Sequence, residues 1–226
     1  MTNIELLDSI MLSNNVYSDF YAIYSDNIEF KKWLDDLLPE IDLCEKQQQN
    51  NPWHKYNVLG HILYSVQAMN NLTRGMNYDT QRMLAYTMLL HDIGKPNTHI
   101  VRQKNGELID SFFNHNIESC KVAKRVLGKL NFNSDQVEII SKLVYKHDIF
   151  MFIRLKDSGN RYHRVLSYKL ISEEIEDLNQ VGDGYTLLKY LVMVGRSDNL
   201  AQNEKMTAES LKLLDTFDTM LDNVKN

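Results

Sequence analysis

Apolar residues recur at every third or fourth position along most of this chain, which is the spacing of an amphipathic helix. The pattern becomes regular after Asn57, a residue that can cap a helix whose apolar face comprises Val58, Ile62, Val66 and Met69. A second helix is expected to start at Asp79 or Thr80 and to run to His91. The same spacing predicts later helices over residues 115–130, 135–148, 162–178, 185–200 and 205–222.

Signals for β-strands are few. Within residues 101–113, the sequence Lys104-Asn105-Gly106-Glu107 is a turn signal that allows a small hairpin or an irregular loop. We therefore predict an all-α fold. It is expected to divide into an N-terminal helical extension over residues 1–50, a main domain over residues 51–204, and a C-terminal helix within residues 205–226 that packs on the same domain.

The composition agrees with a helical protein that buries a core. The chain has 226 residues, of which 43% are apolar, with only 9 Gly and 3 Pro. Scarcity of these helix breakers favours helices, and the length suits one domain of generous size. The formal net charge of −5 argues against non-specific binding to nucleic acid, which requires basic surface to neutralise phosphates. This net charge does not exclude a small anionic substrate that binds in a local positive pocket.

The two cysteines, Cys44 and Cys120, lie far apart and form no CxxC pair, which favours a reducing, intracellular compartment. The N-terminus carries acids and lacks the basic region of a secretory signal. No apolar stretch reaches the roughly 18–20 residues of a membrane span. We therefore expect a cytoplasmic protein with no membrane partner. The terminal helix can pack on the core or form the seam of a homodimer, and the sequence does not separate the two.

Ionisable residues interrupt the apolar faces of five predicted helices. At about 100° per residue, His61 shares a face with Val58 and Met69, and His91 continues the apolar stripe of its own helix. Three later helices each repeat this pattern, and an aspartate directly follows His91. The inward-facing set is His61, His91, Asp92, His115, His147 and Asp198.

Such a set needs a common partner, because a buried polar group without one costs roughly 2–7 kcal/mol. A divalent metal ion would satisfy all six residues together, since imidazole and carboxylate are its ordinary ligands. The alternative is a buried hydrogen-bond network of histidines and aspartates with no metal. Other catalytic templates are absent: the sequence contains no Gly-rich phosphate loop, no G-x-S-x-G and no H-E-x-x-H.

In order and spacing, five segments resemble the HD superfamily of metal-dependent phosphohydrolases: HILYSVQAMN, LLHDIGKP, KNGELIDSFFNHNIESCKVAKRVLGKLNF, LVYKHD and LVMVGRSDNL. The combination of HDIGKP, NG…FFNH and LVYKH is similar, more narrowly, to the HD domain attached to bacterial CCA-adding and poly(A)-adding nucleotidyltransferases. The resemblance covers about residues 54–200 and implies an HD-domain helical bundle. Because the preceding fifty residues are too few for a nucleotidyltransferase head, we do not expect tRNA end-addition.

The resemblance also implies roles for the inward residues. It assigns the primary metal to His61, His91, Asp92 and Asp198. His115 and His147 match two histidines that bind a second metal in binuclear members and contact the substrate phosphate in some mononuclear ones. This chain has Asn114-His115-Asn116 where the family often has Gly-His-Glu. Lys95 matches a position that usually faces the scissile phosphate; the alternative is a solvated surface lysine.

These features together predict a phosphohydrolase with one or two divalent ions per chain, drawn from Mn, Fe, Ni, Co, Zn and Mg. Such an ion lowers the pKa of bound water and polarises a phosphoryl oxygen. Asp92 and Lys95 are the expected catalytic residues. The expected substrate is a phosphorylated small molecule, first of all a nucleotide, and the narrower resemblance implies phosphomonoesterase or 2′,3′-cyclic phosphodiesterase activity. Lys95 and a basic segment that carries Arg154, Arg161 and Arg164 are expected to bind its phosphate; the alternative for the segment is a solvated loop with a basic bias.

Two other functions fit the same residues. One is a non-catalytic module that binds a nucleotide or docks a partner, although every primary ligand position and Lys95 are intact. The other is a scaffold whose histidines only hydrogen-bond to one another. Phosphate release would separate the first alternative from an enzyme, and metal content would separate the second.

Four residues with aromatic rings lie close in the sequence to the predicted ligands. Trp53, His54 and Tyr56 precede the first ligand helix and are expected to pack against the protein rather than to stack on a nucleobase. His99 is expected in an exposed loop.

Overall fold

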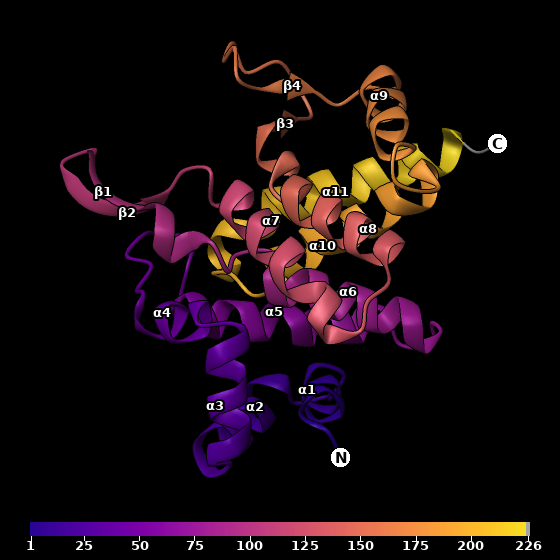
Figure 1. Cartoon of the computed structure of the whole chain (residues 1–226). Helices are drawn as coiled ribbons and strands as arrows, with labels where there is room; N and C mark the ends of the chain where they lie inside the picture. The colour runs from indigo at the N-terminus through magenta and orange to yellow at the C-terminus, as the bar shows by residue number, and fades with distance from the viewer. Residues whose placement is uncertain (225–226) are drawn as a thin grey trace.

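The structure is a computed structural model that describes residues 1–224, and it is built mainly from helices (Figure 1). Its α-helices are α1 (Asn3–Met11), α2 (Val16–Asp26), α3 (Ile28–Leu37), α4 (Glu40–Lys46), α5 (Val58–Leu72), α6 (Tyr78–Leu90), α7 (His115–Val126), α8 (Ser134–Lys146), α9 (Tyr168–Leu178), α10 (Gly184–Leu200) and α11 (Glu204–Val224). The short 3-10 helices are η1 (Lys95–Thr98), η2 (Leu127–Leu130) and η3 (Ile149–Phe152). The strands are β1 (His99–Lys104), β2 (Glu107–Phe112), β3 (Ile153–Arg154) and β4 (Arg164–Val165). The predicted all-α class is confirmed, with two small sheets added.

Capping side chains set the helix starts and correct several predicted boundaries. Asn57 caps α5 as predicted, whereas α6 is capped by Asn77, upstream of its predicted start. The helix predicted over residues 115–130 is α7 followed by η2. The helix predicted over residues 162–178 is α9, which starts later because its first residues pair as β4 with β3 and Ser167 supplies the cap.

One hydrophobic core extends from α1 to α11. Helices α5 and α6 lie side by side at its centre, α10 packs against both, and α7 with α8 covers one side, while α1 to α3 lie beneath (Figure 1). Its fully buried side chains include Phe20, Phe30, Leu59, Ile62, Tyr86 and Phe217. The division at residues 50 and 204 stays a prediction, although the N-terminal helices share the core. Residues 225–226 of the predicted C-terminal segment lie outside the described residues.

A buried ion pair fastens α1 to the central helices. Arg82 of α6 donates from Nε to both carboxylate oxygens of Asp8 in α1, each at 2.9 Å, and from Nη2 to the carbonyl of Leu130 at 2.6 Å. The hydroxyl of Tyr86 donates to the same carboxylate at 2.6 Å. The Arg82 guanidinium also lies 4.0 Å from the ring centroid of Phe132. Both carboxylate oxygens of Asp8 and the hydroxyl of Tyr86 therefore have hydrogen-bond partners in a largely buried place.

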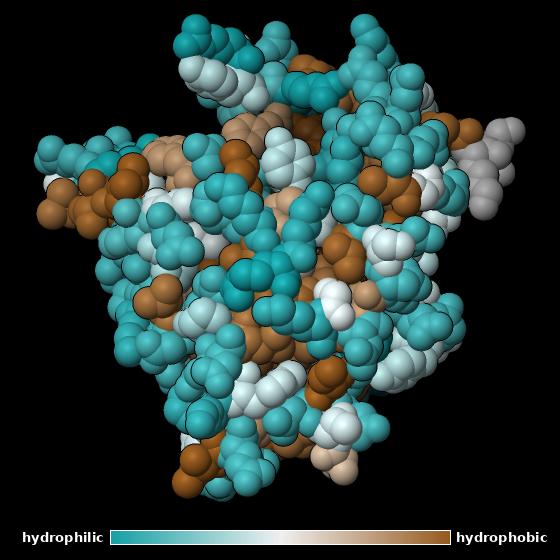
Figure 2. All heavy atoms as spheres, viewed as in Figure 1, coloured by the Kyte–Doolittle hydropathy of each residue, from teal (hydrophilic) through white to brown (hydrophobic). Residues whose placement is uncertain are grey.

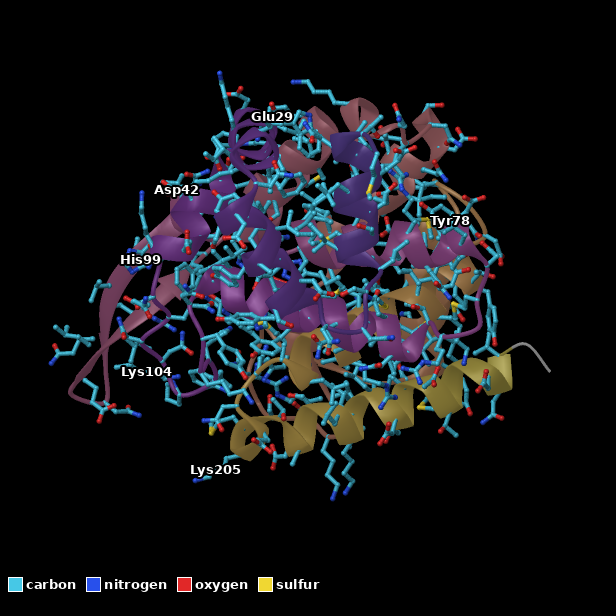
Figure 3. All side chains as sticks on the ribbon, turned by 90° about the horizontal axis from the view of Figure 1, so that it is seen from below. Glu29, Asp42, Tyr78, His99, Lys104 and Lys205 are labelled. Atoms are coloured by element: carbon cyan, nitrogen blue, oxygen red, sulfur yellow. The ribbon has the colours of Figure 1, made fainter. Side chains whose placement is uncertain are left out.

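The β1–β2 hairpin projects from the helices at one side of the molecule (Figures 1 and 3). Asn105 and Gly106 form its turn with φ of 53° and 87°, the left-handed conformation that tight hairpins require. Hydrophobic side chains gather on the hairpin in Figure 2, where Val101 and Leu108 are exposed. The prediction for His99 is wrong: it lies in β1, half-buried, with Nε2 2.8 Å from the Asp110 carboxylate. No helix within residues 1–224 is long and apolar enough to cross a membrane.

Candidate metal centre

The six inward residues predicted from the sequence converge on one place in the fold. Four of them are at most 5% exposed, because they continue apolar helix faces that the neighbouring helices cover. Most of them stand at helix ends, where an apolar face stops and a polar side chain can enter the centre. They are His61 in the first turns of α5, His91 and Asp92 at the end of α6, His115 at the start of α7, His147 at the end of α8 and Asp198 near the end of α10.

Four of these residues form a first cluster, comprising His61, His91, Asp92 and Asp198. Nε2 of His61 lies 2.9 Å from Oδ1 of Asp198 and 3.2 Å from Oδ2 of Asp92. Nε2 of His91 lies 3.4 Å from Oδ2 of Asp92 and 3.4 Å from Nε2 of His61. The structure therefore brings together the four residues predicted for a primary metal.

A second cluster comprises Asp92, His115 and His147. Oδ1 of Asp92 lies 3.1 Å from Nε2 of His115 and 3.5 Å from Nε2 of His147. The two imidazole nitrogens are 3.0 Å apart. Asp92 thus belongs to both clusters and divides its oxygens between them, with Oδ2 toward the first and Oδ1 toward the second.

Backbone carbonyls fix the tautomer of these histidines. Nδ1 lies 2.6 Å from the Met88 carbonyl in His91, 2.7 Å from the Phe112 carbonyl in His115 and 2.7 Å from the Val144 carbonyl in His147. Nδ1 of His61 lies 3.4 Å from the carbonyl of Ala201. Because a carbonyl oxygen only accepts, each Nδ1 carries the proton and donates it. In the neutral imidazole Nε2 therefore presents a lone pair toward the centre, which is the usual arrangement of metal-binding histidines.

This arrangement makes lone pairs face one another across short distances. Nε2 of His61 faces Nε2 of His91 at 3.4 Å, and Nε2 of His115 faces Nε2 of His147 at 3.0 Å. Such contacts are repulsive unless a proton or a metal ion lies between the nitrogens. Two ligand atoms on one ion, each about 2.1 Å from it, lie roughly 3.0–3.4 Å apart. Most of the separations in both clusters fall close to this range, so the donor set fits a divalent ion in each.

The charges of the centre also favour a cation. Burial by itself would raise the pKa of Asp92, but Lys95 and the surrounding histidines hold that pKa well below its usual range. Burial opposes ionisation of Asp198 in the same way, yet the hydrogen bonds that its carboxylate accepts from His61 and His91 when these imidazoles are protonated keep its pKa well below normal. Both carboxylates are therefore ionised in the neutral range. The centre holds two negative charges among imidazole lone pairs, and positive charge is stabilised there.

Asp148 adds a carboxylate that the sequence analysis did not single out. Its oxygens lie 3.8 Å from Nε2 of His115 and 3.7 Å from Nε2 of His147. Burial lowers the pKa of His147, but Asp148 and Asp92 outweigh it and raise the pKa to about 9. Oδ1 of Asp148 is buried and has no hydrogen-bond partner among the described residues. The sequence signal was its position directly after a predicted ligand, in LVYKHD.

Lys95 lies inside the centre and not on the surface. The residue is 5% exposed, which excludes the alternative of a solvated lysine. Its Nζ lies 2.6 Å from Oδ2 of Asp92 and donates to Oε1 of Gln49 at 2.9 Å. A third contact, at 3.3 Å, joins Nζ to Nε2 of His54. Burial, reinforced by the positive charge of Lys95, holds the pKa of His54 well below its ordinary value.

Sequence reasoning missed Gln49 as part of this site and expected only packing from His54. Gln49 is 5% exposed although it belongs to a run of polar residues that predicts a loop. The available signal was weak, since a glutamine in QQQNN is ordinary for a surface turn. Tyr56 follows the expectation of packing on the protein, because its ring stacks on that of Tyr64 with the centroids 4.4 Å apart. Trp53 is exposed, and Lys104 Nζ lies 5.0 Å from its ring.

The three arginines predicted to bind phosphate lie in the segment that carries β3 and β4, and their side chains make contacts within or next to that segment. Arg154 donates to the carbonyls of Met151 and Ile153. Arg161 donates to the hydroxyl of its neighbour Tyr162 at 2.6 Å. Arg164 pairs with the carboxylates of Glu173 and Glu174 in α9. Unlike Lys95, none of the three forms a hydrogen bond or an ion pair with the cluster residues among the contacts described within residues 1–224.

The side chains of the centre are covered to different degrees. His115, Asp148 and Asp198 have side chains that are 12%, 17% and 19% exposed, whereas those of His61 and His91 are almost fully covered. Solvent therefore reaches the centre at those three side chains.

Comparison with known protein families matches residues 58–178, more than half of the chain, to the family described as the HD domain. The match spans α5 to α9 and includes five of the six inward residues; Asp198 lies beyond it in α10. Proteins of this family bind divalent metals and are typically hydrolases, which agrees with the two His/Asp clusters. The narrower resemblance to the HD domain of CCA-adding enzymes stays a prediction. On the family match and the geometry of the centre, this chain belongs to the HD domain family.

Proposed function

We propose that this protein is a metal-dependent phosphohydrolase that acts on a phosphorylated small molecule. The observation that carries the proposal is the position of Asp92, whose two oxygens each face a pair of histidine Nε2 atoms at 3.1–3.5 Å. Neutral imidazoles alone do not explain lone pairs that face one another at 3.0 and 3.4 Å. Shared protons, which the raised pKa values of His61 and His147 allow, or divalent cations would relieve these contacts, and the family's binding of divalent metals favours the cations.

In this proposal the first ion is held by His61, His91, Asp92 and Asp198, and the second by Asp92, His115 and His147. Divalent ions in such sites supply Lewis acidity toward a phosphoryl oxygen and a lowered pKa for water. The carbonyls that accept from Nδ1 orient the imidazoles, and outer partners of this kind raise ligand basicity. Asp148 adds negative potential beside the second pair.

Besides His147, whose pKa is raised to about 9, Lys95 carries positive charge into the centre. Its ammonium lies 2.6 Å from Asp92 in a buried place, where a charge acts more strongly than in water. A phosphoryl group bound at the centre gains negative charge on its outer oxygens as the ester bond breaks. Lys95 stabilises that charge without having to be reorganised, which is the usual source of electrostatic catalysis.

The proposed substrates are nucleotides that carry a phosphomonoester or a 2′,3′-cyclic phosphodiester, which are the bonds cleaved by the two activities that the narrower resemblance implies. The ionised carboxylates of the centre repel a free anion, so the phosphate needs the bound cations and Lys95 to enter. Arg154, Arg161 and Arg164 stay candidates for binding the substrate beyond the phosphate, and Arg164 would have to leave its ion pairs with Glu173 and Glu174 to do so.

The test combines metal content with turnover. Purified protein is analysed by plasma mass spectrometry and assayed for phosphate release or ring opening on a panel of nucleotides and sugar phosphates with Mn²⁺, Mg²⁺, Co²⁺ or Ni²⁺. Asp92→Asn and Asp92→Ala should lose both metal and turnover. Asp135→Asn, at an exposed carboxylate in the first turn of α8, is the matched control and should keep both. Absence of metal from the wild type after incubation with these ions would overturn the proposal, and metal without any turnover would favour a non-catalytic module.

A further inference from the structure

The ammonium group of Lys95 has three N–H donors, and the structure provides three acceptors for them. They are Oδ2 of Asp92 at 2.6 Å, Oε1 of Gln49 at 2.9 Å and Nε2 of His54 at 3.3 Å. Two of these acceptors belong to the loop between α4 and α5, upstream of residues 58–178 that match the family. A long, flexible side chain is therefore held from three directions, and its free end has one defined position.

The amide of Gln49 can be oriented in only one way. Its Nε2 donates to the carbonyl of Tyr56 at 3.3 Å, and a carbonyl oxygen cannot donate in return. The other end of the amide is therefore the oxygen, and it faces Lys95. Because Gln49 is 5% exposed, water does not compete for this oxygen.

The imidazole of His54 is fixed by a similar chain of donors and acceptors. The backbone N–H of Trp53 donates to Oδ1 of Asn51 at 3.2 Å, which identifies that atom as an oxygen. Nδ1 of His54 lies 2.8 Å from the same oxygen and must therefore carry the proton. Nε2 of the neutral ring is left as an acceptor, and it is this atom that faces the ammonium of Lys95.

The loop itself is fastened at both ends and in its middle. The backbone N–H of Val58 donates to the carbonyl of Gln47 at 3.0 Å, which closes the loop at the start of α5. In the middle, the backbone N–H and the side chain of Asn50 both donate to Oδ2 of Asp110, at 2.7 and 2.9 Å. Asp110 lies in β2, and its own N–H donates to the carbonyl of Asn50. The hairpin that His99 and Lys104 mark in Figure 3 therefore braces the loop that carries Gln49 and His54.

We propose that Gln49 and His54 are positioning residues, which together with Asp92 hold the Lys95 ammonium at the point where it meets the substrate phosphate. The inference rests on the proposed function for its catalytic consequence. The contact to His54 is the longest of the three, and its acceptor is neutral. A phosphate oxygen can therefore accept a hydrogen bond from this N–H with the smallest loss of existing interactions. Asp92 and Gln49 meanwhile keep the ammonium in place.

The decisive experiment is a set of double-mutant cycles with Lys95→Met, which keeps the length of the side chain and removes its charge. His54→Phe and Gln49→Leu should each lower kcat/KM about 10- to 100-fold in the wild-type background, the range for loss of a hydrogen bond to a charged group. In the Lys95→Met background both should have almost no further effect, because the group that they position is gone. Equal losses in the two backgrounds would show that these residues act independently of Lys95 and would overturn the inference.

Conservative variants provide a second arm. His54→Gln and Gln49→Glu each retain an acceptor within reach of Lys95 and should lose less activity than His54→Phe and Gln49→Leu. Thermal unfolding and metal content are recorded for all variants, and both should stay near the wild-type values. If the acceptor-free and acceptor-retaining variants were equally impaired, the acceptor would not be what matters at these positions and the inference would be wrong.

A measurement without turnover separates this inference from the proposed function. In ¹H–¹⁵N correlation spectra a buried ammonium with three acceptors exchanges slowly with water, and its signal is assigned by its absence in Lys95→Met. The signal should broaden or vanish in His54→Phe and in Gln49→Leu. An unchanged signal in both variants would refute the positioning role, whereas a wild type that hydrolyses no substrate would refute only the proposed function.

Discussion

Gly94 lies two residues after Asp92 and allows α7 to approach the centre closely. Its N–H donates to Oγ of Ser119 at 3.0 Å. A Cβ atom at this position would lie 2.5 Å from the backbone nitrogen of Ser119 and 2.7 Å from both the carbonyl oxygen of His115 and Cβ of Glu118. The backbone of Gly94 has φ of −84°, which any residue can adopt, so the effect of Gly94→Ala is steric alone.

The size of the displacement follows from these distances. Ordinary non-bonded contacts lie near 3.5 Å, so the first turn of α7 must move away by about 1 Å. His115 begins that helix, and its Nε2 is now 3.1 Å from Oδ1 of Asp92. An increase of this size breaks the contact and exceeds the separation of two ligands on one ion. His61, His91 and Asp198 stand on other helices and should keep the first cluster.

We therefore expect Gly94→Ala to lose the second metal and to keep the first, with a destabilisation of about 1–3 kcal/mol from overpacking. Metal stoichiometry by plasma mass spectrometry and urea unfolding measure the two effects. Gly128→Ala is the matched control, because a Cβ there meets no atom within 4 Å. Wild-type stoichiometry and stability in Gly94→Ala would show that the position of α7 does not depend on this close approach and would refute the prediction.

Three further predictions concern stability. Arg82→Met leaves the buried carboxylate of Asp8 without its cation and should lower the free energy of unfolding in urea by about 3–5 kcal/mol with metal content unchanged; a loss below 1 kcal/mol would contradict this. Burial raises the pKa of Asp110, but hydrogen bonds from His99 and the neighbouring loop outweigh it and lower the pKa. The resulting stability is present above the unfolded pKa and is lost as pH falls through the folded one, so Asp110→Asn should flatten the acid limb of the stability profile. Chelation of metal should lower Tm of the wild type and leave Asp92→Asn unchanged, since an ion that binds the native state stabilises it; equal shifts in both would place the metal elsewhere.

Much of the centre was predictable because the direction of a side chain on a helix is a local property. A residue that continues an apolar stripe must point where the stripe points, whatever the helix packs against. His61, His91 and Asp198 could therefore be assigned to the interior from spacing alone, and the cap at Asn57 located the helix that carries the first of them. The all-α class followed from the same periodicity.

Errors arose where long-range contacts decide the local structure. His99 was expected in an exposed loop, yet it is held in β1 by Asp110, eleven residues away. The start of α9 was predicted too early, because the strand pairing of Arg164 with Ile153 is invisible to helical periodicity. In both cases the residue that decides the local structure lies outside the short stretch of sequence over which such a pattern can be recognised.

The sequence by itself determined which helices form, which of their faces are buried and which ionisable residues those faces carry into the interior. Only the tertiary structure decided how the residues share the centre: that Asp92 divides its oxygens between two pairs of histidines, and that Lys95 is buried with Gln49 and His54 as its acceptors. The physical reason is that facing atoms are set by the angles and distances between helices and by the path of a loop. These depend on contacts between residues far apart in the chain, which no local pattern records.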